Sequence, residues 1–500
     1  MAAKSPIWIG IDIGTQSVRA VAVADNGHLL ASSAAPLTSN RFNQRHEQSP
    51  QEWISAAVQT LRNLTNQLSD PDDIFGLSVS ATSGTIVIVD GDGHPLSAGI
   101  MYDDTRGRPY VDDVNRIGRD LWQRLGYRMQ ASWALPTMLW LIEHSPMPDG
   151  SRFASQADVI TAALAGHRVA SDSSHTLKAG LDLDTLQWPG SIFGALGIDV
   201  GLMPKVVEAG SLIGTVGVAA AAETGLPVGA RLVAGMTDGC AAQIAAGALA
   251  PGQWNSVLGT TLVIKGASDE RKSDPTGAIY SHRAPFGAGW FPGGASSTGA
   301  GSLNEWLPGR NLETLTQAAA HLNRRTATYP LLGDGERFPF VAPDAEAFFS
   351  LKSARPDTDV DLFADITLGV AWVERLAYDL LDLSGYNLEG TITLTGGGAR
   401  NHWWNQLRCD VLRRPVRVPK EAEGAIGMAV LAAAGCAAEG GTDRLNRAAN
   451  RMLPRGTELH PSERSWQQLA PVYVQVVDEL SRRGWIDDSL RSHARRRAAI

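Results

Sequence analysis

The sequence of 500 residues has few cysteines, no surplus of positive charge and no long apolar run. Its three cysteines lie far apart and form no Cys-x-x-Cys pair, so no disulfide framework is predicted and a reducing compartment is favoured. Forty-four basic against 52 acidic residues leave a formal charge of −8. This argues against a nucleic acid as the main partner, because no basic excess is present to neutralise phosphates.

The longest apolar stretch, residues 425–438, is about 14 residues long, whereas a helix that spans a membrane needs about 20. The start of the sequence carries one lysine and a short apolar run broken by Asp12, a pattern unlike a secretory signal. We therefore expect a cytoplasmic protein without a membrane partner.

Several catalytic motifs are also missing. No Gly-Lys pair is present, which excludes the phosphate-binding P-loop, and the His-Arg-Asp and Asp-Phe-Gly motifs of protein kinases do not occur. The histidines lack zinc-ligand spacing, and the absence of a Gly-x-Ser-x-Gly elbow counts against α/β-hydrolases. A hydrophobic share of 44% and a charged share of 19% are typical of a globular protein. At about 150 residues a domain, the length predicts roughly two to four domains.

Strand and helix patterns alternate along the chain, which predicts an α/β fold. The opening predicts strands over residues 7–12, 18–24 and 28–32, with a Gly14-Thr15 turn after the first strand. A later hairpin, over residues 254–258 and 262–265, repeats the Gly-Thr turn at Gly259-Thr260-Thr261. The similarity of the two hairpins suggests a duplicated domain.

The composition places the domain break near residues 240–255, where glycine, alanine and Pro251-Gly252 interrupt the pattern. We predict an N-terminal domain over residues 1–245, a C-terminal domain over 246–470 and a helical tail over 471–500. Further strands are predicted over residues 231–235, 391–394 and 414–418, and helices over 240–250, 369–382, 401–412 and 424–438.

The first turn is a candidate site for an anion. Gly14 lets backbone N–H groups approach a ligand closely, and Thr15 and Ser17 add hydroxyl donors. Asp12, at the end of the strand, can hold Mg²⁺ through water, since hard cations take oxygen ligands. The alternative is a hairpin turn in which the aspartate caps its own backbone.

Asp238 is the second candidate. It follows a predicted strand and precedes a helix of small residues, which is where α/β sheets open their ligand crevice. The alternative is a helix N-cap, for which aspartate is a preferred residue. Residues 235–239 alone leave both interpretations open.

Two later turns could also approach a ligand. Residues 258–261 form a second anion-accepting turn, and residues 395–401 contain three successive glycines between a strand and a helix. Such a turn brings the main chain against a flat or anionic ligand, and the helix N-terminus adds partial positive charge. The alternative is a flexible left-handed turn, although three glycines cost folding entropy that a simple turn would not require.

Together, the two Gly-Thr hairpins, the triple-glycine turn and the two strand-end aspartates resemble the actin/hexokinase-type, ribonuclease H-like ATPase fold. Within it, the chain resembles the FGGY carbohydrate kinase family over nearly its full length, through five segments in the family's order: residues 10–15, 101–106, 235–239, 258–261 and 395–401. The ribulose/xylulose kinase-like branch is the nearest, through residues 80–85, 171–175, 281–283 and 293–299.

The resemblance implies a two-domain kinase that binds ATP, Mg²⁺ and a sugar in the intervening cleft, and it leaves open whether the chain forms a homodimer. Asp238 would be the general base that takes the proton of the attacking hydroxyl, and Asp12 would contact Mg²⁺ or the substrate. The residues implied to reach the sugar hydroxyls are Ser80, Thr82, Asp104 and Arg106. Those implied to bind the phosphates are Gly14, Thr15, Gln16, Gly259, Thr260 and Thr261, and those implied to hold the adenosine are Gly397, Gly398, Asn401 and Trp404.

The sugar side departs from two known patterns. Residues 81–84 stand where better-known xylulose kinases have a Met-His-Gly segment, and residues 101–104 stand where glycerol kinases have a tryptophan motif. D-ribulose is therefore the preferred substrate, with D-xylulose or another polyol as the alternative. An ATPase of the same fold that phosphorylates no sugar is the competing class.

Other polar residues have simpler interpretations. His175 and His282 are expected to be hydrogen-bonded structural histidines. Glu374 and Arg375, on the helix predicted over residues 369–382, are expected to form a solvated or interdomain ion pair. The three arginines at 495–497 are expected to end a solvated helix.

Overall fold

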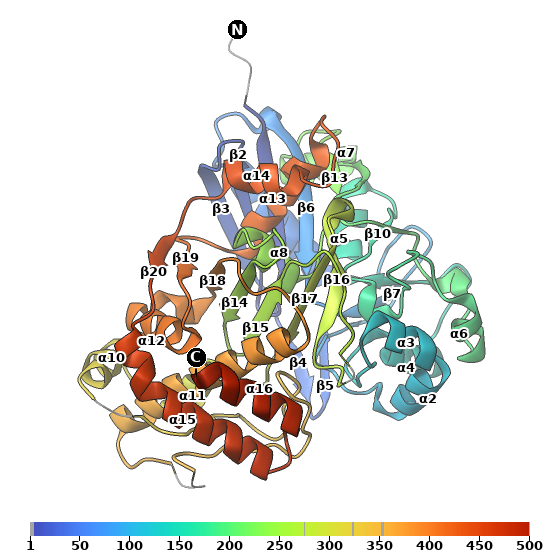
Figure 1. Cartoon of the computed structure of the whole chain (residues 1–500). Helices are drawn as coiled ribbons and strands as arrows, with labels where there is room; N and C mark the ends of the chain where they lie inside the picture. Colours follow the sequence, from blue (N-terminus) through green and yellow to red (C-terminus); the bar gives the residue numbers. More distant parts are fainter. Residues whose placement is uncertain (1–4, 275, 323–324, 352–354, 500) are drawn as a thin grey trace. The chain divides into compact units, whose positions relative to one another are not determined.

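A computed structural model describes residues 5–274, 276–322, 325–351 and 355–499, and its contacts divide the chain into two compact units (Figure 1). Unit 1 comprises residues 1–247, 282–291 and 422–454, and unit 2 comprises residues 248–281, 292–421 and 455–500. The chain first passes from unit 1 to unit 2 after residue 247, which lies within the predicted break near residues 240–255. The prediction differs from this division in placing residues 422–454 with the second domain.

Unit 1 is built on a mixed sheet of six strands in the order β12-β13-β6-β1-β2-β3, within the described residues. β1 runs antiparallel to β2 and parallel to β6. The strands are β1 Ile7–Ile13, β2 Ser17–Ala24, β3 Leu29–Pro36, β6 Ile74–Ala81, β12 Leu212–Thr215 and β13 Arg231–Val233. β1 forms because its sequence, IWIGIDI, is almost continuously apolar and is buried along nearly its whole length.

One helix from late in the chain completes this unit. α13 Gly424–Cys436 is the predicted buried helix, and it packs on β1 and β6 (Figure 1). The approach is close because Gly10 has no side chain: a Cβ there would lie only 1.7 Å from the Ala425 carbonyl oxygen. α8 Asp238–Ala245 packs on α13 in turn, across Gly427. These contacts are the physical reason that residues 422–454 belong to unit 1.

A second sheet of unit 1 has the order β4-β5-β8-β7-β9 over the part of the chain that the structure describes. Its strands are β4 Asn40–Phe42, β5 Arg45–Gln48, β7 Ile86–Val89, β8 Gly99–Ile100 and β9 Arg152–Ser155. The short strands β10 Ser171–Asp172 and β11 Val206–Val207 pair with each other. The remaining α-helices of the unit are α1 Pro50–Thr65, α2 Val111–Ile117, α3 Arg119–Leu125, α4 Ala134–His144, α5 Gln156–Ala165, α6 Gly190–Ala195, α7 Val218–Thr224 and α14 Arg444–Met452.

The sheet built mostly from residues of unit 2 has the order β16-β17-β15-β14-β18-β19-β20 among the described residues. Its strands are β14 Trp254–Leu258, β15 Leu262–Gly266, β16 Tyr280–Arg283, β17 Trp290–Ala295, β18 Ile392–Thr395, β19 Val416–Val418 and β20 Thr457–Leu459. β14 has its predicted bounds. The helices are α9 Gly301–Trp306, α10 Leu312–Ala320, α11 Asp359–Leu383, α12 His402–Leu412, α15 Glu463–Arg482 and α16 Asp488–Ala499.

Two expectations about charges in unit 2 are wrong. Glu374 and Arg375 do not pair with each other in solvent: Glu374 forms a fully buried ion pair with Arg408, at 2.7 Å from Oε2 to Nε. Arg375 instead pairs with buried Asp379, at 3.1 Å. The expectation that residues 495–497 end a solvated helix is wrong for Arg497. Its Nε lies 2.7 Å from the same Asp379 carboxylate, and this ion pair connects α16 with α11.

Candidate active site and nucleotide pocket

Asp12 and Asp238 lie at the same end of the six-stranded sheet of unit 1. Asp12, near the end of β1, pairs in register with Ser80 of β6, and the next residue of β6, Ala81, forms a parallel bridge to Thr237. Asp238 follows as the first residue of α8. The predicted helix start at residue 240 therefore comes two residues late, and the two carboxylates flank the end of one strand.

Asp12 is half-buried, and its surroundings disfavour the ionised form of its carboxyl. Burial raises the pKa of its carboxyl to about 6, and the negative charge of Asp238 also raises it, while the hydrogen bond from Ser80 lowers it. The Ser80 hydroxyl lies 2.6 Å from Asp12 Oδ1. The start of α13 approaches closely as well, since a Cβ on Gly424 would lie 3.0 Å from Asp12 Cγ. A carboxylate that is buried beside a second negative charge is a site that a proton or a cation would stabilise.

Asp238 is exposed, whereas the residue before it is buried. Its Oδ1 accepts the N–H of Gly239 at 2.7 Å. The segment that leads to it requires Gly235, because a Cβ there would lie 1.8 Å from the carbonyl oxygen of Val79 on β6. The N-cap interpretation of Asp238 is wrong, because Thr237 is the N-cap and Asp238 is the first residue of the helix, with a side chain that is accessible to a ligand.

The turn after β1 has the predicted form. The Gly14 N–H donates to the Ser17 carbonyl at 3.0 Å, and Gln48 Nε2 donates to the Thr15 carbonyl at 2.7 Å. Gln16 is exposed. The turn therefore keeps the hairpin geometry of the simpler interpretation, while Thr15 is held beside the aspartates.

Sequence reasoning missed Tyr102, a half-buried residue beside this turn. Burial raises the pKa of its phenol, and the charges of Asp103 and Asp238 raise it further, while a hydrogen bond with Thr15 lowers it. Tyr102 is thus within electrostatic reach of Asp238. The sequence could have indicated Tyr102 as a site residue, because it lies inside the segment 101–106 that carries the family resemblance.

The residues predicted to reach sugar hydroxyls differ in how accessible their side chains are. Asp104 is fully buried and accepts hydrogen bonds from the backbone of His46, at 2.7 Å, and from Arg106. Arg106 also pairs with Glu47 at 2.7 Å. The buried hydroxyl of Thr82 bonds to Gln156 at 2.9 Å. These three side chains are engaged with the protein, whereas Asp12 is partly accessible.

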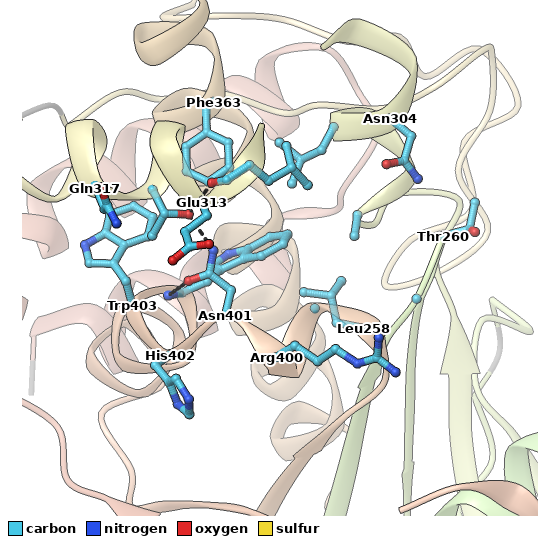
Figure 2. A pocket seen from close by; sticks show the side chains of 18 residues that line it. Leu258, Thr260, Asn304, Glu313, Gln317, Phe363, Arg400, Asn401, His402 and Trp403 are labelled. Carbon is cyan, nitrogen blue, oxygen red and sulfur yellow. Dashed lines mark hydrogen bonds between the residues drawn. The ribbon is translucent and has the colours of Figure 1, made fainter. Parts of the chain in front are cut away.

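A pocket of about 710 Å³ lies entirely within unit 2 (Figure 2). Six of the predicted nucleotide-binding residues line it, namely Gly259, Thr260, Gly397, Gly398, Asn401 and Trp404. Thr261 does not, and the turn of residues 14–16 belongs to unit 1. Sequence reasoning missed the walls that helices α9, α10 and α11 supply, such as Leu303, Leu312 and Phe363, because a single apolar residue on a helix carries no local signal for a pocket.

The triple-glycine turn forms one wall of this pocket. Gly396 has a φ of +84°, and a Cβ there would lie 2.6 Å from the Leu258 carbonyl oxygen. A Cβ on Gly398 would meet the Leu258 side chain at 2.6 Å, whereas a Cβ on Gly397 would meet nothing within 4 Å. Gly397 therefore presents bare backbone to the pocket, and the other two glycines permit the close packing behind it.

Asn401 and Trp404 are held firmly at the start of α12. Asn401 is the N-cap: its Oδ1 accepts the Trp404 N–H at 3.0 Å, and its Nδ2 donates to Thr316 Oγ1 at 2.8 Å. Figure 2 shows Glu313, Gln317 and Trp403 grouped around this asparagine. The Trp404 indole is buried and donates to the Thr367 carbonyl at 2.9 Å. The pocket thus has largely apolar walls with polar groups at fixed hydrogen-bonded positions, as small-molecule sites commonly have.

Comparison with models of protein families identifies the family of this chain. The model of the FGGY family of carbohydrate kinases, N-terminal domain, matches residues 7–245, and that of the C-terminal domain matches residues 255–436. The chain belongs to the FGGY family of carbohydrate kinases. It is an ATP-dependent sugar kinase, as the sequence motifs predicted, which sets aside the competing ATPase class.

Full-length relatives agree with the family. A xylulose kinase of Bacillus subtilis is 26% identical to this kinase over 481 residues, covering 93% of this chain and 95% of the relative. A gluconokinase of Bacillus subtilis is 22% identical over 499 residues, covering 94% and 95%.

Solved structures agree on the fold. Xylulose kinase from Rhodospirillum rubrum superposes with a TM-score of 0.82 at 24% identity, covering 95% of this chain and 98% of that one. Gluconate kinase from Lactobacillus acidophilus superposes with a TM-score of 0.85 at 18% identity, covering 96% and 98%. The predicted actin/hexokinase-type α/β fold of this kinase is confirmed. Among its described residues, no helix has the length and apolarity needed to cross a membrane.

Proposed function

We propose that this kinase transfers the γ-phosphoryl group of ATP to a hydroxyl of a pentulose, with Asp238 as the general base. The observation that carries the proposal is the pair of carboxylates, Asp12 and Asp238, that flank the end of β6 beside the Gly14-Thr15 turn. An exposed carboxylate at a helix start can accept a proton from a hydroxyl held within about 3 Å. Phosphoryl transfer otherwise asks a protein mainly for alignment and neutralisation of charge.

An uncharged sugar suits this site better than a sugar acid. Burial raises the pKa of Asp12 to about 6, and the negative charges of Asp238 and Glu423 add to that rise. The arginines of this region are paired with carboxylates: Arg19, which acts on Asp12, with Glu423 at 3.9 Å, Arg41 with Asp103 at 2.9 Å and Arg106 with Asp104 at 2.7 Å. A substrate carboxylate such as that of gluconate would meet net repulsion here.

Within the pentuloses, two features support different sugars. The departure of residues 81–84 from the segment of better-known xylulose kinases supports D-ribulose, our first choice. The names of the relatives support D-xylulose as the alternative. The hydroxyls of either sugar would be distinguished by groups that hydrogen-bond, because an unpaired buried polar group is costly. Tyr102 is half-buried and interacts with Thr15 and Asp238, and Asp103 follows it in the chain; we add both to the sugar side of the proposed site.

We assign ATP to the pocket of unit 2, with adenosine against Gly397, Gly398, Asn401 and Trp404, and the outer phosphates at Gly259, Thr260 and Thr261. Mg²⁺ is the proposed divalent cation. No cluster of three or more metal-ligating side chains exists among the described residues, which fits a cation that takes one or two carboxylates and completes its shell with phosphates and water. Asp12 would be such a carboxylate. A homodimer stays a prediction.

A panel of substrates tests the proposal directly. Release of ADP is measured with D-ribulose, D-xylulose, L-ribulose, ribitol, glycerol and D-gluconate at equal concentration, with a no-sugar control. We expect the largest kcat/KM with D-ribulose, then D-xylulose, and little stimulation by gluconate. Stimulation by gluconate alone would contradict the electrostatic argument, and a preference for D-xylulose would correct the choice of pentulose only.

A further inference from the structure

Three buried polar residues meet directly behind Asp238. The Ser174 hydroxyl oxygen lies 2.9 Å from His282 Nδ1 and 3.2 Å from Thr237 Oγ1, and it accepts the backbone N–H of Thr237 at 3.2 Å. All three side chains are about 1% exposed. Ser174 and His282 belong to the two polar segments, 171–175 and 281–283, whose histidines are confirmed as buried and hydrogen-bonded.

Thr237 occupies an unusual position for an N-cap. It precedes α8, where a threonine side chain commonly accepts an N–H from the first turn of its own helix. The Thr237 side chain makes no such bond. Its hydroxyl and its backbone N–H are both directed at Ser174 instead. The backbone that sets the direction of the Asp238 side chain is therefore held by Ser174, a residue outside the helix.

Ser174 is itself fixed by its own loop. Its backbone N–H donates to Asp172 Oδ1 at 2.8 Å, and the other oxygen of Asp172 lies 2.6 Å from His175 Nδ1. His175 Nε2 in turn lies 3.3 Å from the Ala81 carbonyl oxygen at the end of β6. The loop thus connects the strand end that the two carboxylates flank with the residue that precedes Asp238.

The hydrogen-bond capacity of Ser174 matches this arrangement. A hydroxyl has one proton to donate and two lone pairs that accept. The Thr237 N–H fills one lone pair, which leaves one donor and one acceptor for His282 Nδ1 and Thr237 Oγ1, while Cys240 Sγ, a weak acceptor, lies 3.9 Å from the same hydroxyl. Every capacity of the hydroxyl is used, so removing either His282 or the hydroxyl leaves a buried polar group unsatisfied.

We propose that Ser174 and His282 are positioning residues for phosphoryl transfer, which hold Thr237 and thereby orient the carboxylate of Asp238. The inference rests on the proposed role of Asp238. A displacement of a reacting group by about 1 Å can lower the rate by a factor of about 10², so the orientation of this carboxylate should strongly affect kcat. Neither residue contacts substrate in this proposal, and neither transfers a proton.

The test measures kcat, the KM of ATP and of the sugar, and thermal stability for Ser174→Ala and His282→Leu, with whichever sugar the panel identifies. We expect kcat to fall about 10- to 100-fold, with both KM values changed less than about threefold. His282→Asn keeps a polar atom near the position of Nδ1, and we expect it to recover most of the rate. Rescue by this variant separates positioning from bulk packing, because asparagine fills the space no better than leucine.

Thr161→Val is the matched control. Thr161 is also buried in unit 1, and its hydroxyl donates to the Ala157 carbonyl of its own helix at 3.1 Å rather than to the segment that precedes Asp238. Its kcat should match that of the parent kinase. An unchanged kcat in Ser174→Ala and His282→Leu would overturn the inference, and so would equal losses in His282→Asn and His282→Leu. If Asp238→Asn itself keeps normal activity, the proposed base is wrong, and that result is distinct from a failure of Ser174 and His282 alone.

Discussion

The two Gly-Thr turns, residues 14–16 in unit 1 and 259–261 in unit 2, share a sequence pattern but differ in their surroundings. The first is fastened by the Gln48 side chain in addition to backbone, since the Leu37 N–H donates to the Gln16 carbonyl at 2.8 Å, and it lies beside carboxylates. The second is fastened by backbone: the Ala300 N–H donates to the Gly259 carbonyl, and the Gly301 N–H to the Thr260 carbonyl, each at 3.0 Å. It borders a largely apolar pocket.

The comparison teaches that the turn alone specifies little chemistry. One turn is completed by groups that can take a proton or a cation, and the other by bare backbone and apolar walls that suit a nucleotide. Substitutions in unit 1 should therefore change the chemical step, and substitutions around the pocket of unit 2 should change nucleotide affinity.

The strongest test of this division is Asp238→Asn. The variant removes a proton acceptor and leaves the pocket of unit 2 intact, so we expect kcat for sugar phosphorylation to fall about 10²- to 10⁴-fold. ATP affinity, measured by calorimetry, should be unchanged. Near-normal phosphorylation would refute the assignment of the base.

The corresponding test in unit 2 is Gly397→Val. A Cβ at Gly397 meets nothing within 4 Å, so the added side chain fits the fold and projects into space that a nucleotide would use. We expect ATP affinity to fall about 10- to 100-fold with little change in thermal stability. Gly398→Ala is the contrast: its Cβ would collide with Leu258, so it should lose stability first. An unchanged calorimetric affinity in Gly397→Val would mean that the nucleotide binds elsewhere.

Arg497→Ala should affect the stability of unit 2 without touching either turn. Arg497 donates a hydrogen bond to buried Asp379, and Tyr473 donates to the same carboxylate at 2.5 Å. Losing a charged hydrogen bond costs about 1.5–3 kcal/mol, which denaturant unfolding can measure. The neighbouring exposed Arg496, replaced by alanine, is the control and should change the unfolding free energy by less than about 0.5 kcal/mol. Equal effects of the two substitutions would count against the ion-pair network.

Ser80→Ala should give the smallest effect, a shift in pH dependence. Because the pKa of Asp12 is raised to about 6, its ionised form is lost as the pH falls through 6, and the Mg²⁺ concentration required for half-maximal activity should rise there. Removing the Ser80 hydrogen bond, which lowers this pKa, should move that rise to higher pH. Ser78→Ala, two residues earlier on β6 and also buried, is the control. The same Mg²⁺ profile in Ser80→Ala and the parent kinase would rule out Asp12 as the titrating group.

Local patterns predicted much of the fold. β1 was found because a nearly continuous apolar run ends at a glycine turn, and β14 because a short strand pattern ends at the Gly259 turn. α12 was predicted from residue 401, which the structure makes its N-cap. α11 was predicted over residues 369–382 but begins at Asp359. Its start depends on Thr358, whose hydroxyl caps the helix by accepting the Asp361 N–H at 3.1 Å.

Long-range partners account for what could not be predicted. The sequence around Glu374 contains an adjacent arginine, yet its partner, Arg408, comes 34 residues later. The close packing of Gly10 against Ala425 joins residues more than 400 positions apart. At the site, the segments of Asp12, Asp238 and Gly397 were identified by their turns, whereas Tyr102 and the Ser174–His282 contact depend on tertiary structure.

The packing of α13 on β1 has a consequence for biosynthesis. Residues 7–13 leave the ribosome more than 400 residues before the helix that covers them. The nascent first half must therefore wait with an uncovered apolar surface, and a product truncated before residue 424 would retain that surface as a target for chaperones and proteases.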